Sequence, residues 1–392
     1  MNFPLASVRV LDLADEPVAL APRLLADLGA DVVRVEPPTG DWLRMRGPFV
    51  HGERGLERGL AHLNYNAGKR SVALDLETKN GIVRLKQLLG KASVVIAPLE
   101  PADHLAPLLE EEEFSRCSSA GLVVPVFRRG APDRATDLTG IAAGGQLFLN
   151  GDSEDPPNHP AGNLAYKQLA LASALAAMSL ILEASDGRKP GRIEVSMQEA
   201  VMWTTIQSAN ENYAFWDRPT PARRGLGNLA GQSVFRTSDD LFVSFSQHPP
   251  AWPAFARWYE ERFADSQYTA PQWEDGLYRV QNNQAIVEAT ERLCASMGRE
   301  ELVTDAQERG ILCVPVHDVS GIATDQHLRE RGFFSNVELP QLGEELELIR
   351  PPFISSNYRS AARAAPALGE QTDEVFREWC GIDISSMQAV RP

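Results

Sequence analysis

Three titratable side chains that stand close together in the sequence could carry acid–base chemistry: Asp137, His159 and Tyr166. An aspartate and a histidine can serve as general acid and base, and an imidazole titrates near neutral pH. Asp137, however, follows Thr136 at the start of a predicted helix, where an aspartate is commonly an N-cap. Lone histidines such as His159 are usually structural or exposed. Tyr166 lies in a run of Ala and Leu, where packing is the default role of a tyrosine.

Two basic pairs could contact phosphate groups: Lys69 with Arg70, and Arg128 with Arg129. Lys69 and Arg70 enter a predicted strand, and a basic pair at such a place is commonly a solvated edge. The four cysteines are widely separated and form no CxxC pair, which argues against a zinc site or a disulfide framework. We therefore expect no metal and no tightly bound cofactor.

Composition and charge limit the class of protein to which the chain can belong. The chain has 392 residues, of which 43% are hydrophobic and 23% charged, as in a globular α/β protein. Single cores seldom grow past roughly 250–300 residues, so we expect two lobes. The formal net charge of −15 would repel a polyanion, which makes nucleic acid an unfavourable partner. We expect a cytoplasmic protein without a membrane partner, because the apolar residues 164–182 include Lys167 and Gln168 and fit a buried helix better than a membrane span.

Residues 8–35 have the pattern of a strand, a helix and a second strand. This order predicts a βαβ unit with parallel strands. Further strand patterns at 71–76, 93–97 and 122–127 extend it to a Rossmann-like parallel sheet, although no GxGxxG motif supports a dinucleotide. We expect an α/β large domain whose N-terminal part is residues 1–215, a smaller α+β domain at 216–332, and a C-terminal segment, 333–392, that returns to the large domain.

An ordered set of sequence phrases is spread over nearly the whole chain. Residues 24–38 read LLADLGADVVRVEPP, 66–76 read NAGKRSVALDL, 194–200 read EVSMQEA, 310–316 read GILCVPV and 368–375 read LGEQTDEV. This set resembles the family III CoA-transferases, also called the CaiB/BaiF family. The resemblance implies a Rossmann-like large lobe, a smaller lobe, and a dimer whose two chains interlock like links. It also implies coenzyme A esters as substrate or ligand.

The resemblance implies a catalytic aspartate that attacks an acyl-CoA thioester and then carries CoA as an aspartyl thioester, until an acceptor carboxylate opens it. Counted without a gap from Pro156 and Pro157, this position is Tyr166. A phenol, with an unperturbed pKa of about 10, cannot become an acyl-thioester carrier. No Asp or Glu occurs from residue 156 to residue 182, so a shifted alignment does not restore the carboxylate.

Asp137 matches an acid that follows a catalytic histidine in the family's racemases.

The phosphate-binding stretches also depart from the family pattern. The segment matching residues 66–76 contacts CoA in the family, so the resemblance implies that Lys69 and Arg70 are candidate CoA contacts. Where the family often reads NFRPG, this chain reads PLEPA at 98–102, and no Lys or Arg occurs between Lys91 and Arg116. The family's SGFG loop is replaced by residues 126–130. Arg128 and Arg129 in this segment are therefore alternative candidates for phosphate contacts.

Three functions remain open from the sequence. The first is the non-catalytic subunit of a heteromeric CoA-transferase of the benzylsuccinate type, with an aspartate-bearing family III paralogue as partner and with acyl-CoA and carboxylate substrates. The second is a self-sufficient acyl-CoA isomerase or racemase, with Asp137 and His159 as acid and base. The third is a CoA-ester-binding or regulatory protein without catalysis. A homodimer is the alternative to the heteromer.

Overall fold

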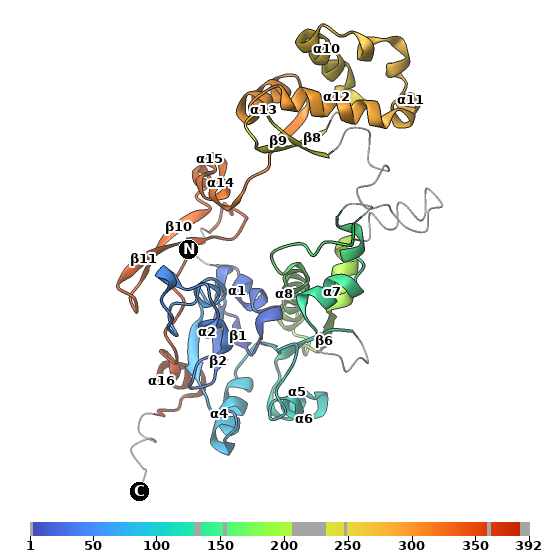
Figure 1. Cartoon of the computed structure of the whole chain (residues 1–392). Coiled ribbons are helices and arrows are strands. Elements are labelled where there is room, and N and C mark those ends of the chain that lie inside the picture. Colours follow the sequence, from blue (N-terminus) through green and yellow to red (C-terminus); the bar gives the residue numbers. More distant parts are fainter. Residues whose placement is uncertain are drawn as a thin grey trace. The chain divides into compact units, whose positions relative to one another are not determined.

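Two compact units make up the chain in the computed structural model (Figure 1). The large unit comprises Met1–Asn150, Pro157–Glu211 and Arg329–Pro392, and the small unit comprises Gly151–Pro156 and Asn212–Leu328. The structure describes residues 3–128, 135–151, 155–205, 233–246, 249–358 and 362–384.

The large unit is built on a six-stranded parallel sheet with the strand order β3-β2-β1-β4-β5-β6. This order is that of a doubly wound Rossmann-like sheet, so the predicted α/β class is confirmed. The strands are β1 (Arg9–Asp12), β2 (Asp31–Glu36), β3 (Arg70–Ala73), β4 (Val94–Ile96), β5 (Gly121–Val126) and β6 (Arg192–Ser196).

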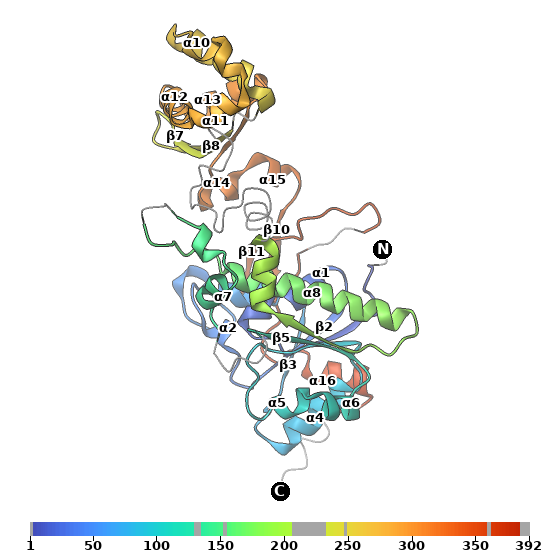
Figure 2. The same ribbon diagram turned by 90° about the vertical axis from the view of Figure 1, so that its right-hand side faces the viewer.

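Alternating side chains of the strands form two cores, one on each face of the sheet. Val10 of β1 belongs to one core, and the next residue, Leu11, belongs to the other. Figure 2 shows the helices in two layers. The first layer contains η1 (Glu16–Val18), α1 (Leu20–Asp27), α7 (Asp137–Ala143) and α8 (Leu164–Ser185). The second contains α4 (Lys79–Leu89), α5 (Ala106–Leu109), α6 (Glu111–Cys117), α16 (Thr372–Val375) and a π-helical turn, η7 (Phe376–Cys380).

Short connecting elements complete the large unit. These are α2 (Trp42–Met45), η2 (Val50–Gly52), α3 (Leu60–Tyr65) and η3 (Leu147–Leu149), and residues 197–205 are helical after β6. Local sequence explains several boundaries. Thr78 caps α4 by accepting a hydrogen bond from Gly81 N at 3.0 Å. A Cβ at Gly81 would lie 1.8 Å from Asp75 O, so the chain needs glycine there.

The segment after residue 333 forms an antiparallel hairpin of β10 (Phe334–Leu339) and β11 (Glu344–Ile349). Val337 and Leu348 pack with Ala67, and Leu339 packs with Leu63. The C-terminal part of the chain is therefore attached to the region between α3 and β3.

The small unit has an antiparallel sheet with one buried face. Its strands are β7 (Ser233–Arg236), β8 (Phe242–Ser246) and β9 (Leu312–Pro315), in the order β7-β8-β9. Phe235, Val243 and Phe245 lie in an aromatic-rich core that also contains Trp252 and Trp273. The helices are α10 (Trp252–Phe263), α11 (Gly276–Gln281), α12 (Asn283–Ala295), α13 (Arg299–Glu308), α14 (Val319–Thr324) and α15 (Gln326–Glu330), with short turns η4 (Pro249–Ala251), η5 (Gln267–Thr269) and η6 (Pro271–Glu274).

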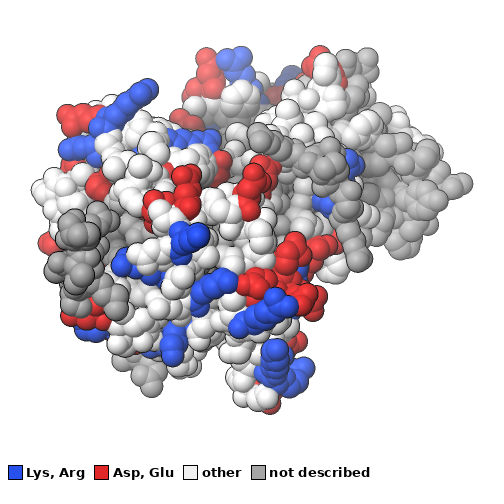
Figure 3. Space-filling view, turned by 90° about the horizontal axis from the view of Figure 1, so that it is seen from below, with Lys and Arg blue, Asp and Glu red and all other residues white. Residues whose placement is uncertain are grey.

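Charged side chains of both signs are interspersed on the face of the molecule seen from below (Figure 3). Among the described helices, α8 alone is long and apolar enough to cross a membrane, judged by length and composition. It packs on β4, β5 and β6, and 33% of its most apolar window is buried. One side of α8 therefore belongs to the core of the large unit.

Candidate active site

The first turn of α8 is capped by a carboxylate from another helix. Asp137 Oδ1 accepts hydrogen bonds from Ala165 N at 2.8 Å and from Tyr166 N at 3.3 Å. An acidic group at a helix N-terminus is favourable because it pairs orphan N–H groups and complements the helix dipole. We expected Asp137 to cap its own helix, but Thr136 is the N-cap of α7. Asp137 instead fixes α8 in place beside α7.

The structure brings His159 to the same carboxylate. His159 Nε2 lies 2.8 Å from Asp137 Oδ2, and the histidine side chain is 41% exposed. Asp137 is buried, so one of its oxygens holds α8 while the other orients the imidazole. A carboxylate–imidazole pair with a solvent-accessible ring can take up and release a proton.

Tyr166 follows in the first turn of α8 and packs against the core beside α1 and the sheet. Burial raises the pKa of its phenol, and the negative charges of Asp137, Asp15 and Glu100 raise the pKa further, although a backbone hydrogen bond to Asp137 opposes them. The phenol therefore stays protonated at neutral pH and offers no phenolate nucleophile.

Besides Asp137, the carboxylates of Asp15 and Glu100 act on the phenol of Tyr166. Asp15 accepts hydrogen bonds from Leu99 N at 2.9 Å and from Glu100 N at 3.1 Å, and burial raises its pKa. Glu100 Oε1 accepts one from Ala135 N at 3.1 Å. Glu100 therefore has a backbone partner, and its negative charge adds to those of Asp15 and Asp137 near Tyr166.

Lys69 lies inside the large unit. Its ammonium donates to Asp12 Oδ2 at 2.7 Å and to Asn66 Oδ1 at 3.0 Å, and burial lowers its pKa. Asp12 also accepts from Arg34 at 3.1 Å. The alternative of a solvated strand edge is wrong for Lys69, because only 5% of the residue is exposed. Its ion pair favours a structural role, and contact with CoA stays a prediction.

Of the other predicted phosphate contacts, Arg70 and Arg128 lie within the described residues. Arg70 is held by Asp31 at 2.6 Å and by Glu374 and Glu378 of the C-terminal segment at 3.1 and 2.7 Å. Arg128 is exposed at the end of β5, with its guanidinium 5.4 Å from the Phe127 ring centre. Arg129 lies outside the described residues. CoA contact by these side chains stays a prediction.

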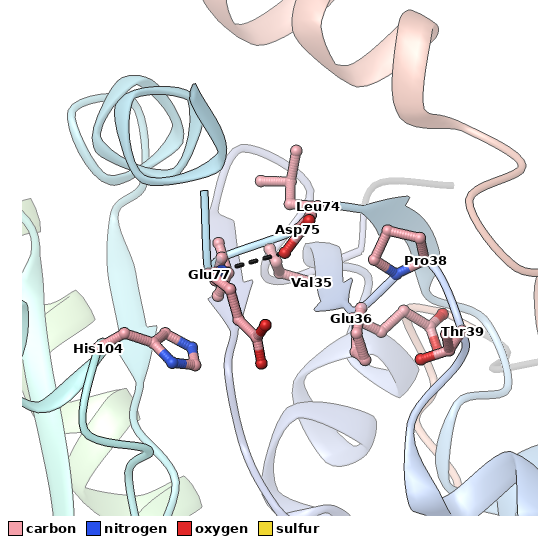
Figure 4. A pocket seen from close by; sticks show the side chains of 10 residues that line it. Val35, Glu36, Pro38, Thr39, Leu74, Asp75, Glu77 and His104 are labelled. Carbon is pink, nitrogen blue, oxygen red and sulfur yellow. Dashed lines mark hydrogen bonds between the residues drawn. The ribbon is translucent and has the colours of Figure 1, made fainter. Parts of the chain in front are cut away.

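A cleft of about 530 Å³ opens at the carboxyl ends of β2 and β3 (Figure 4). In open parallel sheets this edge is where ligands usually bind. Figure 4 shows the Glu77 carboxylate and the His104 ring facing the same space. The lining residues are Val35, Glu36, Pro37, Pro38, Thr39, Leu74, Asp75, Leu76, Glu77 and His104.

The charge of this cleft opposes binding of a phosphate. The described residues that line it include Glu36, Asp75 and Glu77 but no Lys or Arg. Glu36 is neutralised, since it accepts from Arg44 Nε at 2.7 Å and from Ser71 Oγ at 2.6 Å, whereas no described salt bridge involves Asp75 or Glu77. The cleft was not predicted from the sequence, although acidic residues at the carboxyl ends of two parallel strands were a usable signal.

The fold agrees with the comparison to known proteins. The model of CoA-transferase family III matches residues 5–372, and the chain belongs to this family. Enzymes of this family use CoA thioesters as substrates.

Relatives with known names resemble the chain over almost its whole length. The chain is 29% identical to the Thauera aromatica protein succinyl-CoA:(R)-benzylsuccinate CoA-transferase subunit BbsE, with 97% of this chain and 95% of the relative covered. It is 25% identical to the succinyl-CoA–L-malate CoA-transferase β subunit of Chloroflexus aurantiacus, with 97% and 95% covered. A CaiB/BaiF family protein from Brucella suis has the same fold, with a TM-score of 0.80 at 23% identity and coverage of 97% and 100%.

Proposed function

We propose that this chain is the non-catalytic subunit of a heteromeric family III CoA-transferase, which moves CoA between an acyl-CoA and a carboxylic acid. The catalytic aspartate is supplied by a paralogous family III chain. The observation that carries this proposal is Tyr166 at the position of the family's aspartate. The names of two relatives, a subunit BbsE and a β subunit, support a heteromer and suggest succinyl-CoA as the donor.

The reaction needs a carboxylate that can form an anhydride and then a thioester, because only an acyl group can carry CoA between the two acids. Tyr166 cannot supply it. Attack of the Tyr166 oxygen on the thioester carbon would release CoA thiolate and leave an aryl ester, in which Tyr166 has no acyl carbon of its own to carry CoA. The raised pKa of Tyr166 also keeps the phenol in its weakly nucleophilic, protonated form.

The carboxylates around Tyr166 are poor substitutes for the missing aspartate. Asp137 is buried, with one oxygen bonded to two N–H groups and the other to His159. The two oxygens of Asp15 accept separate backbone hydrogen bonds. A nucleophile must be able to approach the thioester carbon, and these groups are fixed by structural contacts.

A reconstitution experiment tests the proposal. The purified chain, an aspartate-bearing family III chain from the same organism, and their mixture are each incubated with succinyl-CoA and a panel of carboxylic acids, and new CoA esters are measured by chromatography. We expect the mixture to transfer CoA and this chain alone to be inactive. In the mixture, Tyr166→Phe should keep the rate within about twofold, since the conservative change removes only the hydroxyl. Transfer by this chain alone would overturn the proposal.

The contact of 2.8 Å between His159 and Asp137 favours a second candidate, an enzyme that moves the α-proton of an acyl-CoA. Incubation of the chain with acyl-CoA esters in deuterated water would then exchange that proton, and His159→Gln would abolish the exchange. A third candidate, a regulatory protein, is favoured if calorimetry detects no binding of a CoA ester and no complex with a paralogue forms.

A further inference from the structure

Two contacts hold the guanidinium of Arg46, which directly follows α2. Its Nη1 donates to Glu16 Oε1 in an ion pair, and its Cζ lies 5.1 Å from the centre of the Trp42 ring. A guanidinium over an aromatic face is attracted by the quadrupole of the ring. The Arg46 side chain is nevertheless 44% exposed. The cation is therefore oriented by its neighbours and remains accessible to solvent.

One edge of the Arg46 guanidinium is open. The Nε and Nη2 atoms of an arginine form a fork that matches the two oxygens of a carboxylate. In Arg44 this fork donates to both oxygens of Glu36, each at 2.7 Å. In Arg70 it donates to both oxygens of Asp31, at 2.9 and 2.6 Å. In Arg46 neither atom donates to a described residue, so the same fork can accept a carboxylate from outside the chain.

Arg46 lies close to the start of α8, where Tyr166 replaces the family's aspartate. Glu16 Oε1, which pairs with Arg46, also accepts a hydrogen bond from Asn163 Nδ2 at 3.3 Å. Asn163 is the N-cap of α8, and Tyr166 follows three residues later, about 4.5 Å along the helix axis. The open fork is therefore connected to the altered site by two side-chain contacts.

The surroundings of Tyr166 favour a ligand whose remaining part is uncharged. The negative charges of Asp137, Asp15 and Glu100 all act on the Tyr166 phenol. A second anionic group directed towards these carboxylates would be repelled. An aromatic group would not be, and the Trp42 ring, which is 37% exposed, offers it a surface for packing.

We propose that Arg46 and Trp42 form a binding site on this chain for a small arylcarboxylic acid. The Nε and Nη2 atoms of Arg46 hold the two carboxylate oxygens, and the aromatic body of the ligand packs on the Trp42 ring. Glu16 keeps the guanidinium in place through Nη1. The inference goes beyond the proposed function, because a subunit without the catalytic aspartate needs no ligand of its own.

Three ligands that differ in one group test the site on the unaltered chain. Phenylacetate, phenylacetamide and acetate are each titrated into the purified chain alone, and binding is followed by calorimetry and by ligand-observed NMR. Phenylacetate should bind about tenfold or more tightly than the amide, because the amide has no charge to pair with the guanidinium. Acetate lacks the ring and should bind about fivefold more weakly than phenylacetate.

Variants of the chain assign this binding to particular side chains. Arg46→Gln removes the charged fork and should weaken binding of phenylacetate about tenfold or more. Arg377→Gln is the control, since Arg377 is exposed on η7 in the other helix layer, and binding should change by less than about twofold. Trp42→Leu should remove most of the advantage of phenylacetate over acetate.

Glu16→Gln separates a ligand site from a structural ion pair. The amide keeps an oxygen for Arg46 Nη1 but removes the negative charge that competes with the ligand, so binding of phenylacetate should strengthen about threefold. An ion pair that only joins α2 to η1 would not give this increase. The proposal is overturned if phenylacetate and phenylacetamide bind equally, if neither binds, or if Arg46→Gln leaves the affinity unchanged.

The titrations use this chain alone, so they are independent of the reconstitution assay. Transfer of CoA by the mixture, without binding of phenylacetate to this chain, would overturn the arylcarboxylate site and leave the proposed function standing. Binding that requires Arg46, in a chain that transfers CoA by itself, would support the site and overturn the proposed function.

Discussion

Replacement of Asp137 by alanine should loosen the start of α8. The carboxylate holds the N–H groups of Ala165 and Tyr166 at 2.8 and 3.3 Å, and Ala165 is buried. A lost N-cap costs about 1 kcal/mol. A hydrogen bond to a charged group contributes about 1.5–3 kcal/mol. Because the two contributions overlap, we expect local opening of the first turn to become easier by about 3 kcal/mol.

Hydrogen exchange followed by mass spectrometry measures this opening directly. At about 1.4 kcal/mol for each factor of ten, amides in the first turn of α8 should exchange roughly 100-fold faster in Asp137→Ala. Asp137→Asn keeps an acceptor oxygen and should give a smaller increase. Asp275→Ala is the control, because it removes the carboxylate that caps α11 through Leu277 N at 2.9 Å and should leave α8 unchanged.

Two results would contradict the capping role of Asp137. Unchanged exchange at the start of α8 in Asp137→Ala would mean that the carboxylate does not hold the helix. A similar increase in α8 after Asp275→Ala would mean that the effect is global rather than local.

Three further predictions concern buried charge and the altered site. Burial lowers the pKa of His62 to about 3, and the positive charge of Arg44 is the second largest cause. The pKa in the unfolded chain is about 6.5. The stability that this neutral imidazole contributes is complete above pH 6.5 and is lost as the pH falls towards 3, by about 2 kcal/mol between pH 6.5 and 5. In urea titrations, the free energy of unfolding of His62→Gln should fall by about 2 kcal/mol less than that of the unaltered protein between pH 6.5 and 5. If the two proteins lose the same amount over this range, His62 is not the buried neutral group. Lys69→Met removes the ammonium 2.7 Å from buried Asp12 and should cost about 1.5–3 kcal/mol in urea unfolding, because Arg34 remains as a partner of Asp12, whereas a loss below about 0.5 kcal/mol would contradict the buried ion pair. Tyr166→Asp should not give the chain alone transferase activity in the succinyl-CoA assay, because the new carboxylate would face Asp15, Glu100 and Asp137, and appreciable activity would show that these changes matter little.

Much of the large unit could be predicted because its signals are local. The apolar strands and the helix after β1 are visible as short patterns with turn residues between them. The hairpin of β10 and β11 was missed because its exposed positions carry repeated glutamates and because its turn, 340–343, contains no Asn-Gly or Asp-Gly pair.

The site was predicted less well because its contacts join distant parts of the chain. The ordered family pattern predicts that Tyr166 stands at the position of the family's aspartate, and this stays a prediction. The pairing of Lys69 with Asp12 spans 57 positions, and that of Asp137 with Ala165 spans 28. Neither contact can be predicted from local sequence. The residues around a charged side chain do not tell whether it is exposed to solvent or paired with a buried partner.

Covalent trapping tests the central claim most directly. The reconstituted complex is incubated with succinyl-CoA, quenched in acid, and both chains are examined by intact mass spectrometry. If this chain is the non-catalytic subunit, the aspartate-bearing partner gains the mass of CoA less one water, as an aspartyl thioester with release of succinate, and this chain keeps its unmodified mass. Addition of CoA to this chain would contradict the account.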